Sequence, residues 1–458
     1  MQDLTSGPLV RHLLKTTGFM LVTMVVQTLY YLVDLYWVGR LGPQAVAAVG
    51  VSGNLMFVVL AVSQMLAVGA TALVSHATGR KDRDHALLVF NQAQVLSVLA
   101  GFVFLILGMA LRGPYARAMS ADPETARLAT AYMNWFVPAG ALQFVMVAMS
   151  AAMRGTGNFK PGMIVQTSTV IINMVMAPIL IFGWFTHRPM GVSGAALATF
   201  IAVLVGSVWM TTFFRAKGAY LTFVPADWKP RLDLWSRMLS IGLPAGAEFG
   251  LMAAYLAIVY VISRPFGAAA QAGFGIGMRI LQAGFMPVVA LGFAVGPVAG
   301  QNFGARKPDR VRETFRTAVV LAGGAMVLFA IVCHIAPAAM VRVFSSDPHV
   351  IAVGEEYLRI VSWNFVASGV IFVSSSMFQA LGNTIPSMVS SFVRILLVAI
   401  PSILMSRMVG FELRWIWYLS VAAVAIQMIL SLLLLRREFA IKLGPAEALQ
   451  PVPTGEPA

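Results

Sequence analysis

Two acidic residues lie inside long apolar stretches of this sequence. Asp34 lies within YYLVDLYWVGRLG (residues 30–42), and Glu248 lies within IGLPAGAEFGLM (residues 241–252). A charged side chain at the centre of a lipid bilayer costs about 2.5–3.5 kcal/mol or more, so it is usually paired or functional. A carboxylate that alternates between water and a buried site can bind and release a proton or a metal cation. The chemistry to consider is therefore cation binding.

Each acid also has a simpler explanation. Asp34 lies about one helical turn from the polar sequence GRLG, so its side chain could reach the membrane surface or pair with Arg40. Glu248 could form an ion pair with Arg279 or Arg394, which also fall in apolar segments. These pairings would make the two acids structural.

Gln27 favours a functional role for Asp34. It lies seven residues before Asp34, which is two turns along the same face of a helix. A polar stripe on one helix face indicates a hydrated cavity rather than contact with lipid.

The composition indicates that membrane helices position these residues. The chain has 458 residues, of which 59% are hydrophobic and 11% are charged, whereas soluble domains carry about 25% charged residues. A helix of about 20 apolar residues can cross the hydrocarbon core of a bilayer. Twelve such segments are predicted, near residues 13–38, 45–74, 85–111, 124–152, 161–184, 193–214, 238–263, 269–300, 311–336, 351–380, 386–408 and 414–435. We therefore predict an all-α, multi-pass membrane protein.

The net charge of +14 does not indicate a nucleic-acid partner, because the basic residues are unevenly distributed. Most Lys and Arg fall in loops on the same side as the N-terminus, among them Arg80, Arg154 and Arg306. Short cytoplasmic loops of membrane proteins carry this excess. We therefore predict a protein of the cytoplasmic (inner) membrane with both termini in the cytoplasm. The first apolar segment is too long for the core of a signal peptide, so we expect it to be retained.

The two halves of the sequence are related to each other. One constant shift in residue number, which we call the repeat offset, aligns identical residues: Gly42 with Gly267, Gly50 with Gly275, Gly79 with Gly304, Asp84 with Asp309, Asp122–Pro123 with Asp347–Pro348, Tyr132 with Tyr357, and Gly157–Asn158 with Gly382–Asn383. Each half contains six predicted helices, so both halves have the same orientation, related by a pseudo-two-fold axis along the membrane normal. Two such bundles enclose a central cleft, where transporters place their substrates.

Four parts of the chain follow from this repeat. We predict an N-terminal six-helix lobe (1–216), a cytoplasmic linker (217–233), a C-terminal six-helix lobe (234–436) and a tail (437–458). The tail is rich in Pro and weakly charged, so we expect it to be a disordered cytoplasmic end. The single cysteine, Cys333, cannot form an internal disulfide.

Several motifs resemble those of the MATE family (multidrug and toxic compound extrusion transporters). They are LVDLYWVGRLGPQAVAAVG at the first helix, GPVAGQNFGARKPDRVRE after the eighth, its counterpart HATGRKDRD, and the paired turns RGTGNFKP and QALGNTIP. The resemblance covers residues 10–436. It implies twelve helices in two lobes and the cation-coupled export of bulky, often cationic organic molecules.

The resemblance also implies a cation site in the first lobe. Asp34 falls on the acid of helix 1 that binds the coupling cation, and Gln27 matches a family glutamine. Tyr132 and Asn173 occupy the positions of a tyrosine in helix 4 and an asparagine in helix 5. One departure is Ala177, where many members of this branch have an aspartate just before a proline. A pair of shared carboxylates is therefore excluded in this chain.

In the second lobe, the resemblance implies a role for Glu248. Members of another branch carry a helix 7 glutamate eight residues after the proline, which corresponds to Met252 here, whereas Glu248 lies four residues after Pro244. A displacement of one turn keeps the same helix face. We therefore place Asp34, Glu248 and Met252 in the predicted substrate cavity.

The predicted function is an antiporter that exchanges H⁺ or Na⁺ for small organic substrates at these carboxylates. Asp34 would be a metal ligand only if the coupling ion is Na⁺, and no other cofactor is implied. We expect the protein to act as a monomer in the bilayer. An alternative is a flippase or exporter of lipid-linked or anionic envelope precursors, for which Arg279, Arg359 and Arg394 are candidate contacts. A passive channel is a further alternative, and no metal-binding or nucleophile motif indicates an enzyme.

Overall fold

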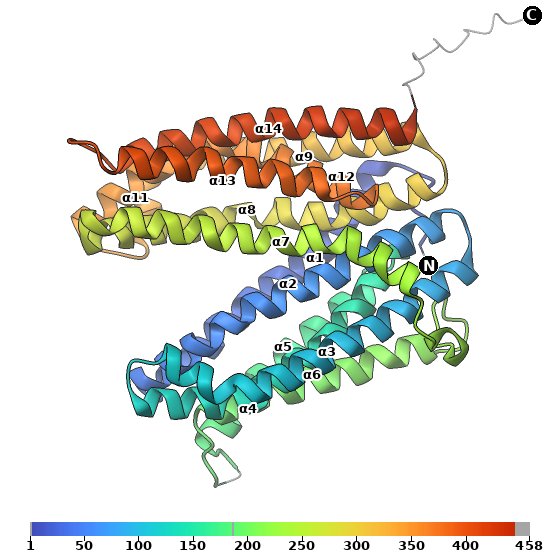
Figure 1. Ribbon diagram of the computed structural model, residues 1–458, viewed down its shortest axis with the longest axis horizontal. Coiled ribbons are helices and arrows are strands. Elements are labelled where there is room, and N and C mark those ends of the chain that lie inside the picture. The colour runs from blue at the N-terminus through green and yellow to red at the C-terminus, as the bar shows by residue number, and fades with distance from the viewer. Residues whose placement is uncertain (1, 186, 445–458) are drawn as a thin grey trace, which may run out of the picture.

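The computed structural model describes residues 2–185 and 187–444, and its helices form two lobes (Figure 1). The first lobe, blue to green in Figure 1, lies below the second lobe in that view. Its helices are α1 (Leu9–Gly39), α2 (Pro43–Gly79), α3 (Arg83–Met119), α4 (Pro123–Gly155), α5 (Lys160–Phe182) and α6 (Val192–Arg215).

The second lobe, yellow-green to red in Figure 1, follows a linker with one short 3-10 helix. Its elements are η1 (Pro225–Trp228) in the linker, then α7 (Leu232–Ser263), η2 (Arg264–Phe266), α8 (Gly267–Gly304), α9 (Pro308–Ile335), α10 (Pro337–Arg342), α11 (Pro348–Val361), η3 (Ser362–Asn364), α12 (Phe365–Ala380), α13 (Ile385–Met405) and α14 (Arg414–Leu443).

The number of membrane spans agrees with the sequence. Within the described residues, eleven continuous helical stretches are long and apolar enough to cross a membrane. One of them, residues 232–304, contains both α7 and α8, which η2 joins, so twelve spans result. The prediction of an all-α membrane protein is confirmed. One predicted span, 351–380, is not a single helix, because η3 divides it into α11 and α12.

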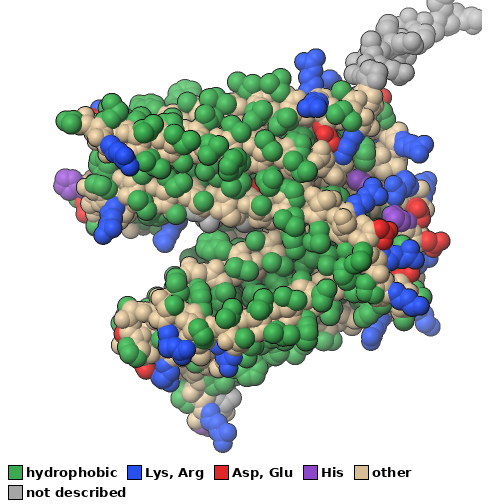
Figure 2. Space-filling model, viewed as in Figure 1, with side chains coloured by type: hydrophobic (Ala, Val, Ile, Leu, Met, Phe, Trp, Pro, Cys, Tyr) green, Lys and Arg blue, Asp and Glu red, His purple; other side chains and the backbone are tan. Residues whose placement is uncertain are grey.

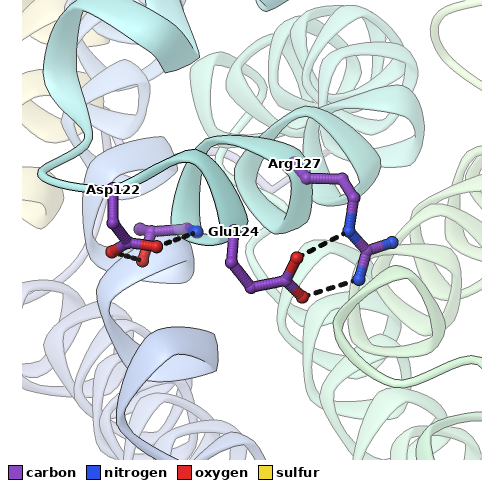
Figure 3. Close-up of polar contacts among 4 residues, drawn as sticks. Asp122, Glu124 and Arg127 are labelled. Atoms are coloured by element: carbon purple, nitrogen blue, oxygen red, sulfur yellow. Dashed lines mark hydrogen bonds and ion pairs between the residues drawn. The ribbon is translucent and has the colours of Figure 1, made fainter.

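The repeated Asp-Pro pair begins equivalent helices in the two lobes. The carboxylate of Asp122 accepts hydrogen bonds from the backbone nitrogen of Thr125 at 2.9 Å and from its hydroxyl at 2.6 Å (Figure 3). These hydrogen bonds hold the pKa of Asp122 below its ordinary value. Asp347 likewise accepts a hydrogen bond from the nitrogen of His349 at 2.8 Å. An Asp cap followed by Pro fixes the start of a helix, so the pair sets where α4 and α11 begin.

Two buried side-chain amides of α3 hold the linker in place. Asn91 accepts hydrogen bonds from the nitrogen of Val224 and from the indole of Trp228, both at 3.0 Å. Gln92 accepts one from the nitrogen of Arg231 at 2.9 Å. Both amides are fully buried, and buried polar groups are costly unless they are hydrogen-bonded. The linker is therefore packed on the first lobe.

The first turns of α1 and α7 cross into the opposite lobes. Leu9 and Leu13 of α1 belong to the core of the second lobe. Leu234 and Met238 of α7 belong to the core of the first lobe. The repeat offset relates these two pairs of positions to each other. The lobes are therefore interlocked symmetrically at one end of the molecule.

On the face that Figure 2 shows, Lys and Arg side chains are denser at the interlocked end than at the opposite end. We call the interlocked end the basic end; it includes the turns at residues 79–83, 215–232 and 304–308. The opposite end, with the turns at 39–43 and 263–267, is called the open end. Figure 2 shows a wide cleft between the lobes that opens there.

The sequence predicts a disordered tail over 437–458, but α14 continues to Leu443. Glu438 is 6% exposed, and both of its carboxylate oxygens accept hydrogen bonds from the side-chain amide of Asn383 at 3.1 Å. Because α14 packs there, the prediction is wrong for the first part of the tail, up to Leu443. Residues 445–458 lie outside the described residues.

Candidate functional site

A cleft separates the two lobes at the open end (Figure 2). In Figure 1, α1 and α2 of the first lobe face α7 and α8 of the second lobe across it. Asp34 lies on α1 and Glu248 lies on α7. The two helices are equivalent members of the repeat, so each lobe contributes one acid.

Asp34 has an unsatisfied carboxylate oxygen. Its Oδ1 atom is buried and has no hydrogen-bond partner among the residues that the structure describes. The Arg40 guanidinium donates instead to the hydroxyl of Tyr36 at 2.6 Å and lies 5.5 Å from the centre of the Trp37 ring. A buried charged group without a partner is costly. A cation at Asp34 would remove this cost.

Polar side chains from α4, α5 and α6 surround this part of α1. Asn173 donates a hydrogen bond to the hydroxyl of Thr199 at 3.0 Å, and the Tyr30 hydroxyl lies 3.2 Å from the same oxygen. Tyr132 is 6% exposed and Asn173 is 3% exposed. The hydroxyls of both Tyr30 and Tyr132 lie near Asp34. The structure therefore brings Asp34, Tyr132 and Asn173 into one cluster, together with two hydroxyls that the sequence did not predict.

Gln27 and Ala177 lie at the edges of this cluster. Gln27 is exposed on α1 two turns before Asp34, and its side chain lies near the hydroxyl of Tyr31. Ala177 is 1% exposed and packs in an apolar cluster with Ile181. No group of three or more His, Cys, Asp or Glu that could hold a metal ion occurs in the described part of the chain. Any cation here would be bound by one carboxylate and neutral oxygens.

Glu248 belongs to a separate cluster between α7 and α13. Ser387 and Arg394 of α13 lie near its carboxylate, and the Ser387 hydroxyl donates to the hydroxyl of Ser375 at 2.8 Å. The Arg394 guanidinium lies 5.5 Å from the centre of the Tyr255 ring. Met252, one turn after Glu248, is 47% exposed. Glu248 and Met252 are thus neighbours on α7, but Glu248 contacts different helices from Asp34.

A small cavity lies between the lobes, with side chains from both of them. Its volume is about 30 Å³, and its lining includes Gln64, Arg154, Phe293 and Gln379. The sequence places Arg154 in a loop, but α4 extends to Gly155, so Arg154 is a helical residue that lines this cavity. We call this site the cleft floor.

Two hydrogen bonds, which we call the clasp, join the lobes next to the cleft floor. His76 Nε2 of α2 donates to the carbonyl oxygen of Ala380 in α12 at 2.6 Å. Gln301 Nε2 of α8 donates to the carbonyl oxygen of Gly155 in α4 at 2.9 Å. The two donors are related by the repeat offset, and so are the two acceptors. Each lobe therefore makes the same contact to the other.

Two glycines allow the helices of the clasp to approach closely. A Cβ atom added to Gly79 would lie 2.0 Å from the carbonyl oxygen of Gln301. A Cβ atom added to Gly304 would lie 2.2 Å from the carbonyl oxygen of His76. Real Cβ atoms essentially never approach an oxygen this closely. Glycine is therefore required at both positions for this closed arrangement.

The segment before α1 covers the clasp at the basic end. The nitrogen of Gln2 donates to the carbonyl oxygen of Thr156 at 2.9 Å in the first lobe. The nitrogen of Leu4 donates to Gln301 Oε1 of the second lobe at 3.0 Å. Leu4 is 0% exposed. This segment therefore bridges the two lobes where they are closed.

Replacing Gln301 with leucine is expected to destabilise the closed form. The change leaves the Leu4 nitrogen and the Gly155 oxygen buried without partners, at a cost of about 1–3 kcal/mol for each group. A lower apparent melting temperature of the detergent-solubilised protein is the expected result. Gln271→Leu, on the same helix but at an exposed hydrogen bond, should leave the melting temperature unchanged. Equal melting temperatures for both variants would contradict this role of Gln301.

Comparisons with known proteins agree with this architecture. The MatE family matches residues 20–179 and 244–405. The probable multidrug resistance protein YoeA of Bacillus subtilis is 25% identical over 420 residues, or 90% of each chain. An FAD transporter of Shewanella oneidensis is 23% identical over 403 residues, or 87% of this chain and 88% of that protein.

A solved structure, described as the outward-facing conformation of a multidrug resistance MATE family transporter, has the same fold. It matches with a TM-score of 0.88 at 23% identity, over 96% of this chain and 97% of that chain. The family match covers both halves of the repeat and most of their membrane helices. This chain therefore belongs to the MatE family of transporters.

Proposed function

We propose that the protein is a cation-coupled antiporter that exports bulky, often cationic organic compounds by alternating access. The observation that carries this proposal is the buried, unpartnered oxygen of Asp34 in a member of the MatE family. Relatives described as multidrug resistance proteins support the substrate class.

The proposed exchange takes place at Asp34. In the open state, a proton or Na⁺ enters from the cleft and neutralises the carboxylate, and the substrate leaves. After the lobes rock, the cation is released on the other side and a new substrate binds. Tyr30, Tyr132, Asn173 and Thr199 are the neutral groups that would orient the carboxylate or complete the coordination of Na⁺.

We further propose that the basic end faces the cytoplasm, with the N-terminus on that side. The gathering of Lys and Arg at this end supports the assignment, since short cytoplasmic loops carry such an excess. With this orientation, the cleft opens outward and the clasp closes the cytoplasmic side.

The arginines of the second lobe favour an exporter over a flippase for anionic lipid precursors. Arg279 is exposed on α8, and Arg359 forms an ion pair with Glu355 at 2.9 Å. Arg394 lies over the Tyr255 ring. These three guanidinium groups have different surroundings, which favours separate structural roles over one shared site for a polyanionic lipid headgroup.

Transport in proteoliposomes tests the proposed coupling. The purified protein is reconstituted with ethidium inside, and a pH gradient or a Na⁺ gradient is imposed separately. One of the two gradients is expected to drive ethidium against its own concentration gradient. An ionophore that collapses that gradient should stop the movement. Downhill movement alone, with either gradient, would indicate a passive channel and contradict the proposal.

A further inference from the structure

We propose that the cleft floor is a binding site for an anionic group, a carboxylate or a phosphate, of a transported organic molecule. The inference rests on the proposed function and specifies the substrate class further. It assigns the central role to Arg154, which belongs to neither acidic cluster.

Arg154 lies where a cargo molecule in the cleft would meet both lobes. It is the penultimate residue of α4, directly before Gly155, whose carbonyl oxygen takes part in the clasp. The cavity that it lines includes residues of α2, α8 and α12 as well. Its volume of about 30 Å³ exceeds the roughly 10–15 Å³ that one buried water requires. There is therefore space for a small polar group beside the guanidinium.

The hydrogen-bonding capacity of Arg154 is largely unused. Its Nη1 atom donates to the hydroxyl of Ser150 at 3.3 Å, and its guanidinium lies 5.9 Å from the centre of the Phe293 ring. No ion pair to Arg154 occurs within residues 2–185 and 187–444. A guanidinium has five N–H donors and binds carboxylates and phosphates through two parallel hydrogen bonds. An anionic ligand would supply the missing partner.

The other polar groups of the cleft floor are compatible with an anion. Gln64 and Gln379 line the same cavity and carry neutral amides that can donate hydrogen bonds. Gln379 occupies the position equivalent to Arg154 in the second lobe. No acidic side chain is among the described residues that line this cavity. The floor therefore carries a single positive charge, contributed by the first lobe.

A cationic group and an anionic group would then be bound at different places. The cationic group would lie near one of the two candidate acids, Asp34 or Glu248, and the anionic group would reach Arg154. Zwitterionic molecules with an acidic group should consequently bind more tightly than their esters, which lack the negative charge.

Two dyes that differ by one ester provide the test. Rhodamine 110 has a free carboxylate, and rhodamine 123 is its methyl ester. Binding of each dye is measured by fluorescence anisotropy with the full chain in phosphatidylcholine nanodiscs, so that no anionic lipid competes. Arg154→Gln is expected to weaken rhodamine 110 binding about tenfold or more, the effect of losing a charged hydrogen bond. Rhodamine 123 binding should stay within about twofold, since its ester lacks the charge.

Two further variants separate binding from folding. Gln379→Glu places a carboxylate beside Arg154 from the opposite lobe and should cause the same selective loss of rhodamine 110. Arg316→Gln removes an exposed arginine of α9 that does not line the cavity, and it should change neither affinity.

The outcomes distinguish this inference from the proposed function. Equal weakening of both dyes by Arg154→Gln, or no weakening of either, would overturn the anion site. Wild-type protein that binds rhodamine 123 but not rhodamine 110 would overturn the site and leave the export proposal intact. If neither dye is bound and no ion gradient drives ethidium, the proposed function fails, and this inference fails with it.

Discussion

Asp34→Asn is expected to abolish uphill export. In proteoliposomes with a tenfold gradient of the coupling ion, one-for-one exchange can maintain about a tenfold gradient of ethidium, equivalent to about 1.4 kcal/mol. The amide of asparagine carries no charge and cannot take up a proton or balance Na⁺. Ethidium should therefore reach equal concentrations on both sides in this variant. The steady-state distribution of ethidium is the measurement.

A matched substitution serves as the control. Glu124→Gln makes the same kind of change at an exposed acid of α4, which forms a surface ion pair with Arg127. It should transport ethidium as the wild type does. If Asp34→Asn is well folded and still builds the full gradient, the assignment of cation binding to Asp34 is wrong.

Gly304→Val is expected to open the basic end. The first carbon of the new side chain would lie 2.2 Å from the carbonyl oxygen of His76, so α8 and α2 must separate. Overpacking of this kind costs about 1–3 kcal/mol, which shifts a two-state equilibrium by about 5-fold to 150-fold. Gly79→Val should have the same effect, because the equivalent contact on the other lobe has the same geometry.

Cysteine labelling reports this opening. A cysteine at Thr71, which lines the cleft floor, is introduced into a Cys333→Ala background. In inside-out vesicles, which expose the basic end in our orientation, a membrane-impermeant maleimide should label it faster in Gly304→Val. Gly323→Val is the control, because an added Cβ at Gly323 meets nothing within 4 Å. Equal labelling rates in the wild type and Gly304→Val would contradict a closure that depends on this glycine.

The sequence predicted the spans and the repeat because both depend on local properties. Segment length and hydropathy identify membrane helices, and the repeat offset identifies the two copies. The exchange of the first turns of α1 and α7 was not predictable, since it depends on which apolar surfaces meet in three dimensions. The pattern of apolar residues likewise could not predict that η3 divides one membrane span into α11 and α12. It also could not predict that α14 extends to Leu443, because that pattern does not show that Glu438 is buried.

The candidate site was only partly predictable. Asp34 and Glu248 were identified because acids are rare in apolar segments, and Tyr132 and Asn173 were identified through the family resemblance. Thr199 gave no signal, since threonine is common in membrane helices and often bonds to its own backbone. Arg154 was assigned to a loop because its helix ends only one residue later.

The symmetry of the clasp bears on how the two halves of the chain can differ. In a two-fold dimer, if residue i of one subunit contacts residue j of the other, then residue j of the first subunit also contacts residue i of the second. Such an interface is called isologous. His76 with Ala380 and Gln301 with Gly155 preserve that pattern within a single polypeptide. In a true homodimer, any charge at the interface would occur twice and face its own copy. Within one polypeptide the two copies can differ, and here the neutral Gln379 is the counterpart of Arg154.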